Sequence, residues 1–219
     1  MGTVVLLGFS TAGKSHILRH FKNVMGSGID TLDSDSEMSK DFCGHIYHLF
    51  SKLVDGVDRS RALACIGDRE NAMLRWLQPT VKPRLIAFGP AIPSRPEWVE
   101  FLQRVQPAVF YLELSECEVR EGLRGRRDKH LEDGLESLPA FGSWDEDVTT
   151  VLDAESGRWV PIEDEEIVCG NIRRHMAGLT HLYSEAAGPK RTYSSKRLRE
   201  SNEYQQGFYA TVAAALRQS

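Results

Sequence analysis

A glycine-rich stretch at residues 8–15, GFSTAGKS, carries the residue types that bind a phosphate chain. In the spacing Gly8-x4-Gly13-Lys14-Ser15, glycines let backbone N–H groups face one anion, and a following helix adds its positive end. Lys14 of such a loop meets the β- and γ-phosphates of a nucleotide, and the Ser15 hydroxyl binds Mg²⁺. The alternative is a glycine turn with an incidental lysine. Placement after an apolar run favours the phosphate loop, for which we expect these ATP contacts: Gly8, Ser10, Thr11, Ala12, Gly13, Lys14, Ser15 and His16.

Two aspartates in the sequence DSD could complete a nucleotide site. Asp33 and Asp35 alternate, so at the end of a strand their side chains would share a face. One carboxylate could then serve Mg²⁺ while the other points toward an acceptor hydroxyl. The alternative for each is a solvated acidic turn.

Strands and helices alternate along the first half of the chain, which predicts a parallel sheet covered by helices on both faces. We expect strands at 3–9, 30–38, 84–88 and 108–114, and helices at 13–24, 37–55, 58–78, 96–105, 115–129 and 202–216. Such sheets bind ligands beyond the carboxyl ends of their strands. The phosphate loop, the two aspartates and Gly89 all follow strands, so we expect them to converge at one edge.

Residues 128–195 differ in composition from the rest and are expected to form an extended lid or insertion. Acidic clusters at 145–147 and 163–166 flank the sequence VTTVLDAESGRWVPI, which predicts a β-hairpin turning at 155–157. The expected organisation is therefore a kinase-type core at 1–127, the insertion at 128–195, and a C-terminal helix at 196–219 that returns to the core.

Composition and missing motifs exclude several classes of protein. The net charge of −4 argues against nucleic acid or an anionic membrane as a partner, because binding either one needs a concentrated positive field on the protein. Four cysteines without a C-x-x-C pair favour a reduced, cytoplasmic protein. We expect the protein to be a monomer or a homodimer. A GTPase needs D-x-x-G directly after a strand together with N-K-x-D, and a motor ATPase needs an apolar strand ending in Asp-Glu. Neither is found, which leaves a small phosphoryl-transfer enzyme.

Four segments, VVLLGFSTAGKS, DTLDSDSEM, LIAFGPAI and VFYLELSECEVREGLRGRRD, resemble shikimate kinase in their order along residues 3–128. The resemblance implies a P-loop NTPase fold, with a five-stranded parallel sheet flanked by helices and an extended lid. It also implies ATP- and Mg²⁺-dependent transfer of a γ-phosphate to a hydroxyl group. Asp33 would then serve the metal, and Asp35 would bind the hydroxyl that is phosphorylated.

The resemblance also assigns roles to arginines. Arg69, in the turn GDRE, would hold a substrate carboxylate, for which a guanidinium fork is well shaped; alternatively it pairs on a helix surface. Arg126 and Arg127 match the lid arginine that closes over the transferring phosphate and stabilises its charge. Either Arg120 or Arg124 would lie against the adenine.

The sequence departs from the family pattern after the third strand. Shikimate kinases have three consecutive glycines there, whereas this chain keeps only Gly89 and continues with Pro90 and Ala91. Pro90 removes one N–H donor, and a lost hydrogen bond in a desolvated site costs about 1–3 kcal/mol. We expect Gly89 to contact the substrate, but the change argues against shikimate itself.

A second departure lies in the sequence LTHLY. Leu179 stands where the family has a second carboxylate-binding arginine, although Tyr183 matches the end of that motif. Three other arginines could take the place of this carboxylate-binding arginine only if the fold positions them at the substrate: Arg191, Arg197 and Arg199.

We therefore expect a kinase that phosphorylates a hydroxyl of a small molecule, with Lys14, Asp35, Arg126 and Arg127 as its catalytic residues. The acceptor could be shikimate, a related hydroxylated acid, a sugar acid or a nucleoside-like compound, and the long lid also admits a peptide. Two alternatives are a nucleotide-binding regulatory protein without turnover and a nucleotide hydrolase.

Overall fold

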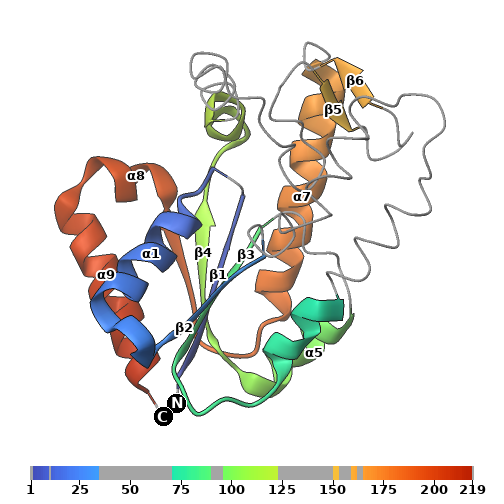
Figure 1. Cartoon of the computed structure of the whole chain (residues 1–219). Helices are drawn as coiled ribbons and strands as arrows, with labels where there is room; N and C mark the ends of the chain where they lie inside the picture. Colours follow the sequence, from blue (N-terminus) through green and yellow to red (C-terminus); the bar gives the residue numbers. More distant parts are fainter. Residues whose placement is uncertain are drawn as a thin grey trace.

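The computed structural model describes residues 2–9, 11–34, 71–89, 96–122, 150–152, 159–161 and 165–218. Its centre is a parallel five-stranded sheet with the order β2-β3-β1-β4-β7 (Figure 1). The strands are β1 (Thr3–Gly8), β2 (Asp30–Asp33), β3 (Arg84–Phe88), β4 (Ala108–Glu113) and β7 (Lys190–Ser194). This arrangement confirms the expected fold class.

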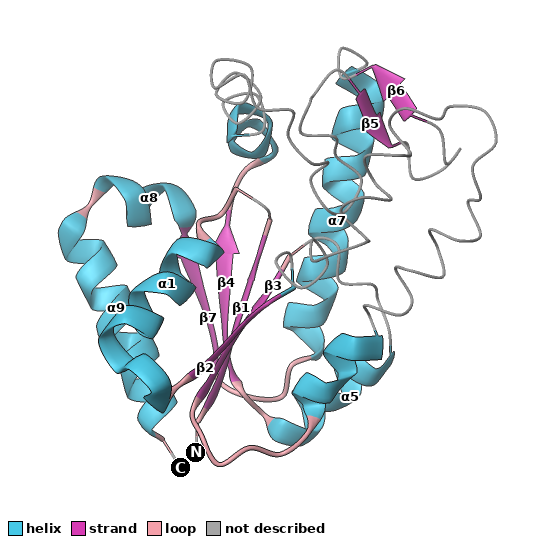
Figure 2. Cartoon of the chain, in the orientation of Figure 1, coloured by secondary structure: helices cyan, strands magenta, loops and turns pink. Residues whose placement is uncertain are grey.

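Helices cover both faces of the sheet, as Figures 1 and 2 show. One face carries α1 (Lys14–Met25), α8 (Ser195–Glu200) and α9 (Asn202–Arg217), and the other carries α5 (Pro96–Val105) and α7 (Glu165–Glu185). Two short 3₁₀ helices, η1 (Gly26–Gly28) and η2 (Arg75–Leu77), lie in connections. Among the described helices, none combines the length and the apolar character needed to cross a membrane.

The central strand β1 is apolar on both sides because it lies between two layers of helices. Successive side chains of a strand point to opposite faces. Val4 and Leu6 accordingly join the core under α1 and α9, while Val5 and Leu7 join the core under α5 and α7. All four side chains are fully buried. The strand that leads into the phosphate loop is therefore fixed from both faces.

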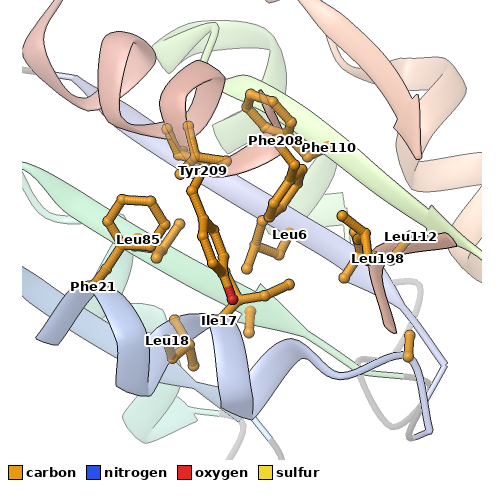
Figure 3. Close-up of a cluster of buried hydrophobic side chains, with 14 of the residues drawn as sticks. Leu6, Ile17, Leu18, Phe21, Leu85, Phe110, Leu112, Leu198, Phe208 and Tyr209 are labelled. Atoms are coloured by element: carbon orange, nitrogen blue, oxygen red, sulfur yellow. The ribbon is translucent and has the colours of Figure 1, made fainter. Parts of the chain in front are cut away.

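The C-terminal helix α9 packs on the sheet, as the sequence predicts for 202–216. Figure 3 shows Phe208 and Tyr209 of α9 among the side chains of β1, β4 and α1. The Phe208 ring lies edge-on to Phe110 of β4 at 5.9 Å, and Tyr209 lies edge-on to Phe21 of α1 at 5.8 Å. This helix thus holds α1, which begins at the phosphate loop, against the sheet.

The range 128–195, expected as a lid or insertion, contains two elements of the core. Strand β7 pairs with β4 from Val109 to Glu113 as the fifth strand of the sheet. Helix α7 contributes a buried side chain to each apolar cluster. Ile172 joins the cluster that includes α1 and α9, and Leu182 joins the cluster that includes α5. The core therefore extends beyond residue 127, and the sequence KRTYS concealed β7 because an outer strand needs no continuous apolar run.

Other expected elements agree with the structure over most of their described residues, although the strand expected at 30–38 ends at Asp33 and Ser34 is already helical. The strands β5 (Thr150–Leu152) and β6 (Trp159–Pro161) pair antiparallel, as the predicted hairpin requires, while its turn at 155–157 lies outside the described residues. Helix α5 begins at Pro96 as expected. Of the helix expected at 58–78, residues 71–77 are described and helical, and the one expected at 37–55 lies outside.

Candidate phosphate-binding site

The phosphate loop connects the buried end of β1 to the first turn of α1. Gly13 caps this helix with φ 84° and ψ 12°, a left-handed conformation that favours glycine. Space around its Cβ position is open, so the requirement at Gly13 is conformational rather than steric. The Ala12 N–H donates to the Phe9 carbonyl at 2.9 Å and closes the turn within the loop. The His16 and Ile17 N–H groups donate to the Gly13 carbonyl at 3.1 and 3.2 Å, so α1 begins directly after the loop.

Lys14 lies across the loop rather than in solvent. Its side chain is only 2 % exposed, and Nζ donates to the carbonyl oxygens of Gly8 at 2.8 Å and Phe9 at 2.9 Å. Burying an ammonium is costly unless it is hydrogen-bonded, and these two carbonyls supply that compensation. The lysine charge is therefore held at the β1 end of the loop.

Ser15 and Asp33 meet although they belong to different elements. The Ser15 hydroxyl, in the first turn of α1, donates to Oδ2 of Asp33, the last residue of β2, at 2.7 Å. A hydroxyl and a carboxylate oxygen are hard oxygen ligands of the kind that Mg²⁺ prefers. The structure thus brings together the two residues expected at the metal. Their metal role itself stays a prediction.

The ends of β2 and β3 are tied by a hydrogen bond that the sequence analysis did not foresee. Gly89, just after β3, donates its N–H to Oγ of Ser34 at 3.0 Å, and Ser34 is fully buried. The bond places Gly89 beside the segment that carries the two aspartates. A small polar residue between Asp33 and Asp35 was the only sequence signal for this contact.

An open cavity of about 310 Å³ lies beside the phosphate loop. Its lining consists of Thr11, Gly13, Lys14, Ser15, His16, Gly122 and Arg199. Lys14 and Arg199 are cations, and none of these seven residues is acidic. The Thr11 hydroxyl is buried without a hydrogen-bond partner among the described residues, and Thr11 is 9 % exposed. An unpaired buried hydroxyl beside a cavity lined by two cations and no acidic residue fits a phosphate ligand.

Helix α8 forms one wall of the cavity and contacts the backbone of the loop. The buried Ser195 hydroxyl donates to the Ala12 carbonyl at 2.9 Å. One turn later, Nη1 of Arg199 donates to the Thr11 carbonyl at 3.5 Å. Sequence reasoning missed Ser195 and assigned Arg199 no place at the loop, because no local pattern signals a contact across more than 180 residues.

The helix over residues 116–122 forms another wall. Its start is a capping box: the Ser115 hydroxyl accepts from the Glu118 N–H, and the Glu118 carboxylate accepts from the Ser115 N–H at 2.7 Å. The expected N-cap at Ser115 is thus confirmed. Gly122, the last described residue of this helix, packs so closely on Thr11 that a Cβ would lie 2.8 Å from two Thr11 carbon atoms.

An ion pair joins the same helix to α7. Arg173 donates from Nε to Oε2 of Glu116 at 2.9 Å, and this bond lowers the pKa of the carboxyl group. The Cys169 thiol shares this carboxylate, and the hydrogen bond to it raises the pKa of the thiol. Arg120 is near enough to lower the pKa of Glu116 further. The ion pair therefore connects the 116–122 helix to α7, which are the described helices before and after residues 123–164 in the sequence.

Several predicted site residues lie outside the described part of the chain: Ser10, Asp35, Arg69, Arg126, Arg127, Pro90, Ala91 and Arg124. Their roles stay predictions. Of the three arginines considered as substitutes on the acceptor side, Arg199 lies at the phosphate loop instead. Arg197 stacks on Tyr204 of α9 at 4.3 Å, and Arg191 is exposed on the outer strand β7. Leu179 is buried.

The fold and this loop define a P-loop α/β protein, and comparison with solved structures makes the fold more specific. Shikimate kinase from Bacteroides thetaiotaomicron superimposes with a TM-score of 0.56 at 12% sequence identity, covering 99% of both chains. Shikimate kinase from Acinetobacter baumannii, solved in complex with shikimate, also gives 0.56, at 17% identity, covering 98% of this chain and 94% of its own. No protein-family model and no curated protein matches the sequence. The chain has the fold of the shikimate kinases.

Proposed function

We propose that this protein is an ATP- and Mg²⁺-dependent kinase that transfers the γ-phosphate to a hydroxyl of a small molecule. The observation that carries the proposal is the 2.7 Å hydrogen bond between Ser15 and Asp33, beside a lysine that spans the phosphate loop. A glycine turn without chemistry would need neither a buried lysine nor a hydroxyl–carboxylate pair at its edge.

The residues of the cavity, together with Asp33 beside it, fit the two groups that the proposal requires. The unpaired Thr11 hydroxyl, Lys14 and the start of α1 suit a phosphate chain, and the oxygens of Ser15 and Asp33 suit a divalent cation. Mg²⁺ at these oxygens would neutralise part of the charge on the phosphates. Lys14 would leave its two carbonyl partners for the β- and γ-phosphates, which offer a stronger, charge-assisted hydrogen bond.

Catalysis of phosphoryl transfer consists mainly of positioning and charge stabilisation. In this proposal Asp35 orients the acceptor hydroxyl and takes its proton, and Gly89 and Arg69 bind the acceptor. Arg126 and Arg127 close over the transferring group. The Ser34–Gly89 bond supports the acceptor side, because it fixes the backbone immediately before Asp35.

A small hydroxylated compound is the acceptor we propose. The Acinetobacter baumannii enzyme of the same fold was solved with shikimate, a compound of this class. Pro90, Ala91 and the buried Leu179 argue for a different member of the class. A panel of hydroxylated acids, sugar acids and nucleosides, with shikimate included, is therefore the appropriate set of candidate acceptors.

The test is ADP release with ATP and Mg²⁺, with and without each acceptor, for the wild type, Ser15→Ala and Lys14→Met. Lys22→Ala is the matched control, because Lys22 is an exposed lysine on the same helix α1. Acceptor-dependent release that both site variants lose and the control keeps would support the proposal. Tight ADP binding without release for any acceptor would favour a regulatory protein, and absence of nucleotide binding would refute the kinase.

A further inference from the structure

The end of the molecule opposite the phosphate loop carries exposed aliphatic side chains. The five strands are parallel, so they all begin at the edge of the sheet opposite the loop, and Figure 1 shows both chain termini there. Among the described residues, three large hydrophobic side chains are exposed, all at this end: Val24 at 70 %, Val81 at 83 % and Val105 at 40 %. The amino-end surface, as we call it, is formed by residues 22–30, 78–83, 104–107, 185–190 and 215–218.

Cations accompany the valines on the amino-end surface. Each valine has an exposed cation within two positions of it in the sequence, and two more come from the first residue of β7 and the last residue of α9. The five are Lys22, Lys82, Arg104, Lys190 and Arg217. Two acidic side chains of the same surface, Asp30 and Glu185, are half-buried and accept hydrogen bonds from Thr80 and Gln103. The surface is therefore rich in positive charge although the chain as a whole has a net charge of −4.

Helix electrostatics explain only part of this pattern. Three of the cations lie in the last turns of α1, α5 and α9, where a positive charge interacts favourably with the helix dipole. Lys190 donates to the Ser184 carbonyl near the end of α7. The dipoles do not account for Lys82, which lies in a connection, or for the valines. One exposed aliphatic side chain is ordinary on a protein surface, but three that share one end with five cations indicate a binding surface.

Hydrogen bonds tie the segments of the amino-end surface to one another. The Asp30 N–H donates to the Pro83 carbonyl at 3.0 Å, which joins the start of β2 to the segment that carries Val81. On the other side of the sheet, the Val109 N–H donates to the Pro189 carbonyl at 2.8 Å and joins β4 to the segment before β7. Strand β1 lies between them, paired with both β3 and β4. The exposed side chains therefore lie along one continuous edge of the sheet.

We propose that the amino-end surface binds a membrane that contains anionic lipids. Aliphatic side chains on separate segments suit a plane, because each can insert at the boundary between headgroups and acyl chains, and the neighbouring Lys and Arg residues attract the lipid phosphates. A peptide partner would instead need a groove that gathers the apolar side chains. On such a membrane the phosphate loop, at the opposite edge of the sheet, would face away from the lipid. This inference does not depend on the proposed function.

The test is co-sedimentation of the whole protein with vesicles of phosphatidylcholine, alone or mixed with phosphatidylserine. We expect binding to the mixed vesicles that weakens as the salt concentration rises. Lys82→Ala should lower the partition coefficient about fivefold, which is the contribution of one cation near an anionic surface. Val81→Ser should lower it about tenfold, because a hydroxyl replaces apolar groups that insert. Lys196→Ala is the matched control and should leave binding nearly unchanged, because Lys196 is exposed on α8 at the other end of the molecule.

Three results would overturn the inference. The first is that the wild type binds neither kind of vesicle, or binds both equally. The second is an equal loss in Lys82→Ala and Lys196→Ala, which would indicate a general effect of charge. The third is binding to a labelled DNA duplex without binding to the mixed vesicles, which would assign the cations to nucleic acid.

Folding and turnover are measured on the same variants. Because Val81 and Lys82 are exposed, the melting temperatures of Val81→Ser and Lys82→Ala should match that of the wild type. ADP release in the absence of vesicles should also be the same in Val81→Ser and the wild type. Loss of vesicle binding with unchanged ADP release therefore separates this inference from the proposed function, and either one can fail without the other.

Discussion

The two sides of the phosphate loop are built in different ways. On the side proposed for the nucleotide, α1, α8 and the 116–122 helix each touch the loop, through Lys14, Ser195 and Gly122. On the side proposed for the acceptor, a hydrogen bond from Gly89 to Ser34 joins the ends of β2 and β3. Under the proposed function, nucleotide binding would depend on a loop held by three helices, whereas acceptor recognition would depend on a few residues at strand ends. Changes on the two sides should therefore have separable effects.

The largest expected effect concerns Asp33, the proposed metal ligand, which would serve both sides of the site. Asp33→Asn keeps the size of the side chain and its bond to Ser15 but removes the negative charge, so the proposed Mg²⁺ would be bound less well. We expect the rate of transfer to fall by at least about 100-fold, since metal stabilisation of the transition state is worth several kcal/mol. Stopped-time measurement of ADP release at saturating ATP and Mg²⁺ checks this, and a loss of less than tenfold would remove Asp33 from the metal site.

A second change breaks only the nucleotide side. Gly122→Ala introduces a Cβ 2.8 Å from two carbon atoms of Thr11, so either the helix or the loop must shift. We expect ADP affinity to fall about tenfold, which corresponds to about 1.4 kcal/mol, with the KM for the acceptor unchanged. Gly207→Ala on α9 is the matched control, because its Cβ position is open and alanine favours a helix. Unchanged ADP affinity in Gly122→Ala would show that this wall does not position the loop.

A third change breaks only the acceptor side. Ser34→Ala leaves the buried N–H of Gly89 without its acceptor, at a cost of about 1–3 kcal/mol in stability. We expect the KM for the acceptor to rise several-fold while the KM for ATP stays within twofold. Thermal melting and two-substrate kinetics measure these effects. Equal increases in both KM values would mean that the two sides are not separable.

The smallest expected effect concerns the ion pair of Glu116 and Arg173. The pair holds the pKa of Glu116 below its ordinary value, so it stabilises the folded state above that ordinary pKa. This stabilisation disappears as the pH falls through the lowered pKa of the folded state. The melting temperature of Arg173→Gln should therefore be slightly below that of the wild type at neutral pH and equal to it in acid. Because the pair is exposed, the difference should also shrink in high salt. A difference that persists below pH 3 would contradict this account.

The sequence predicted the parts of the molecule that have a local pattern. The loop at 8–15 and the buried strand before it follow from spacing and apolar runs, and the capping residue Ser115 from its residue type. Strand β7 was missed because its sequence KRTYS is polar, and polar outer strands resemble loops. The positions of Ser195 and Arg199 at the loop depend on how α8 packs after β7 joins the sheet. No spacing of residues in the chain encodes that contact.

The contacts from α8 to the phosphate loop have a consequence for the order of folding. Ala12 and Ser195 are 183 residues apart, and Thr11 and Arg199 are 188 apart. During synthesis, β1 and the loop emerge early, yet the fifth strand and the wall that carries Arg199 come from residues 190–200. Contacts of such long sequence separation form late, because a large loop must close before they gain anything. Under the proposed function, a nascent chain should therefore acquire its full affinity for nucleotide only after β7 has entered the sheet and α8 has docked.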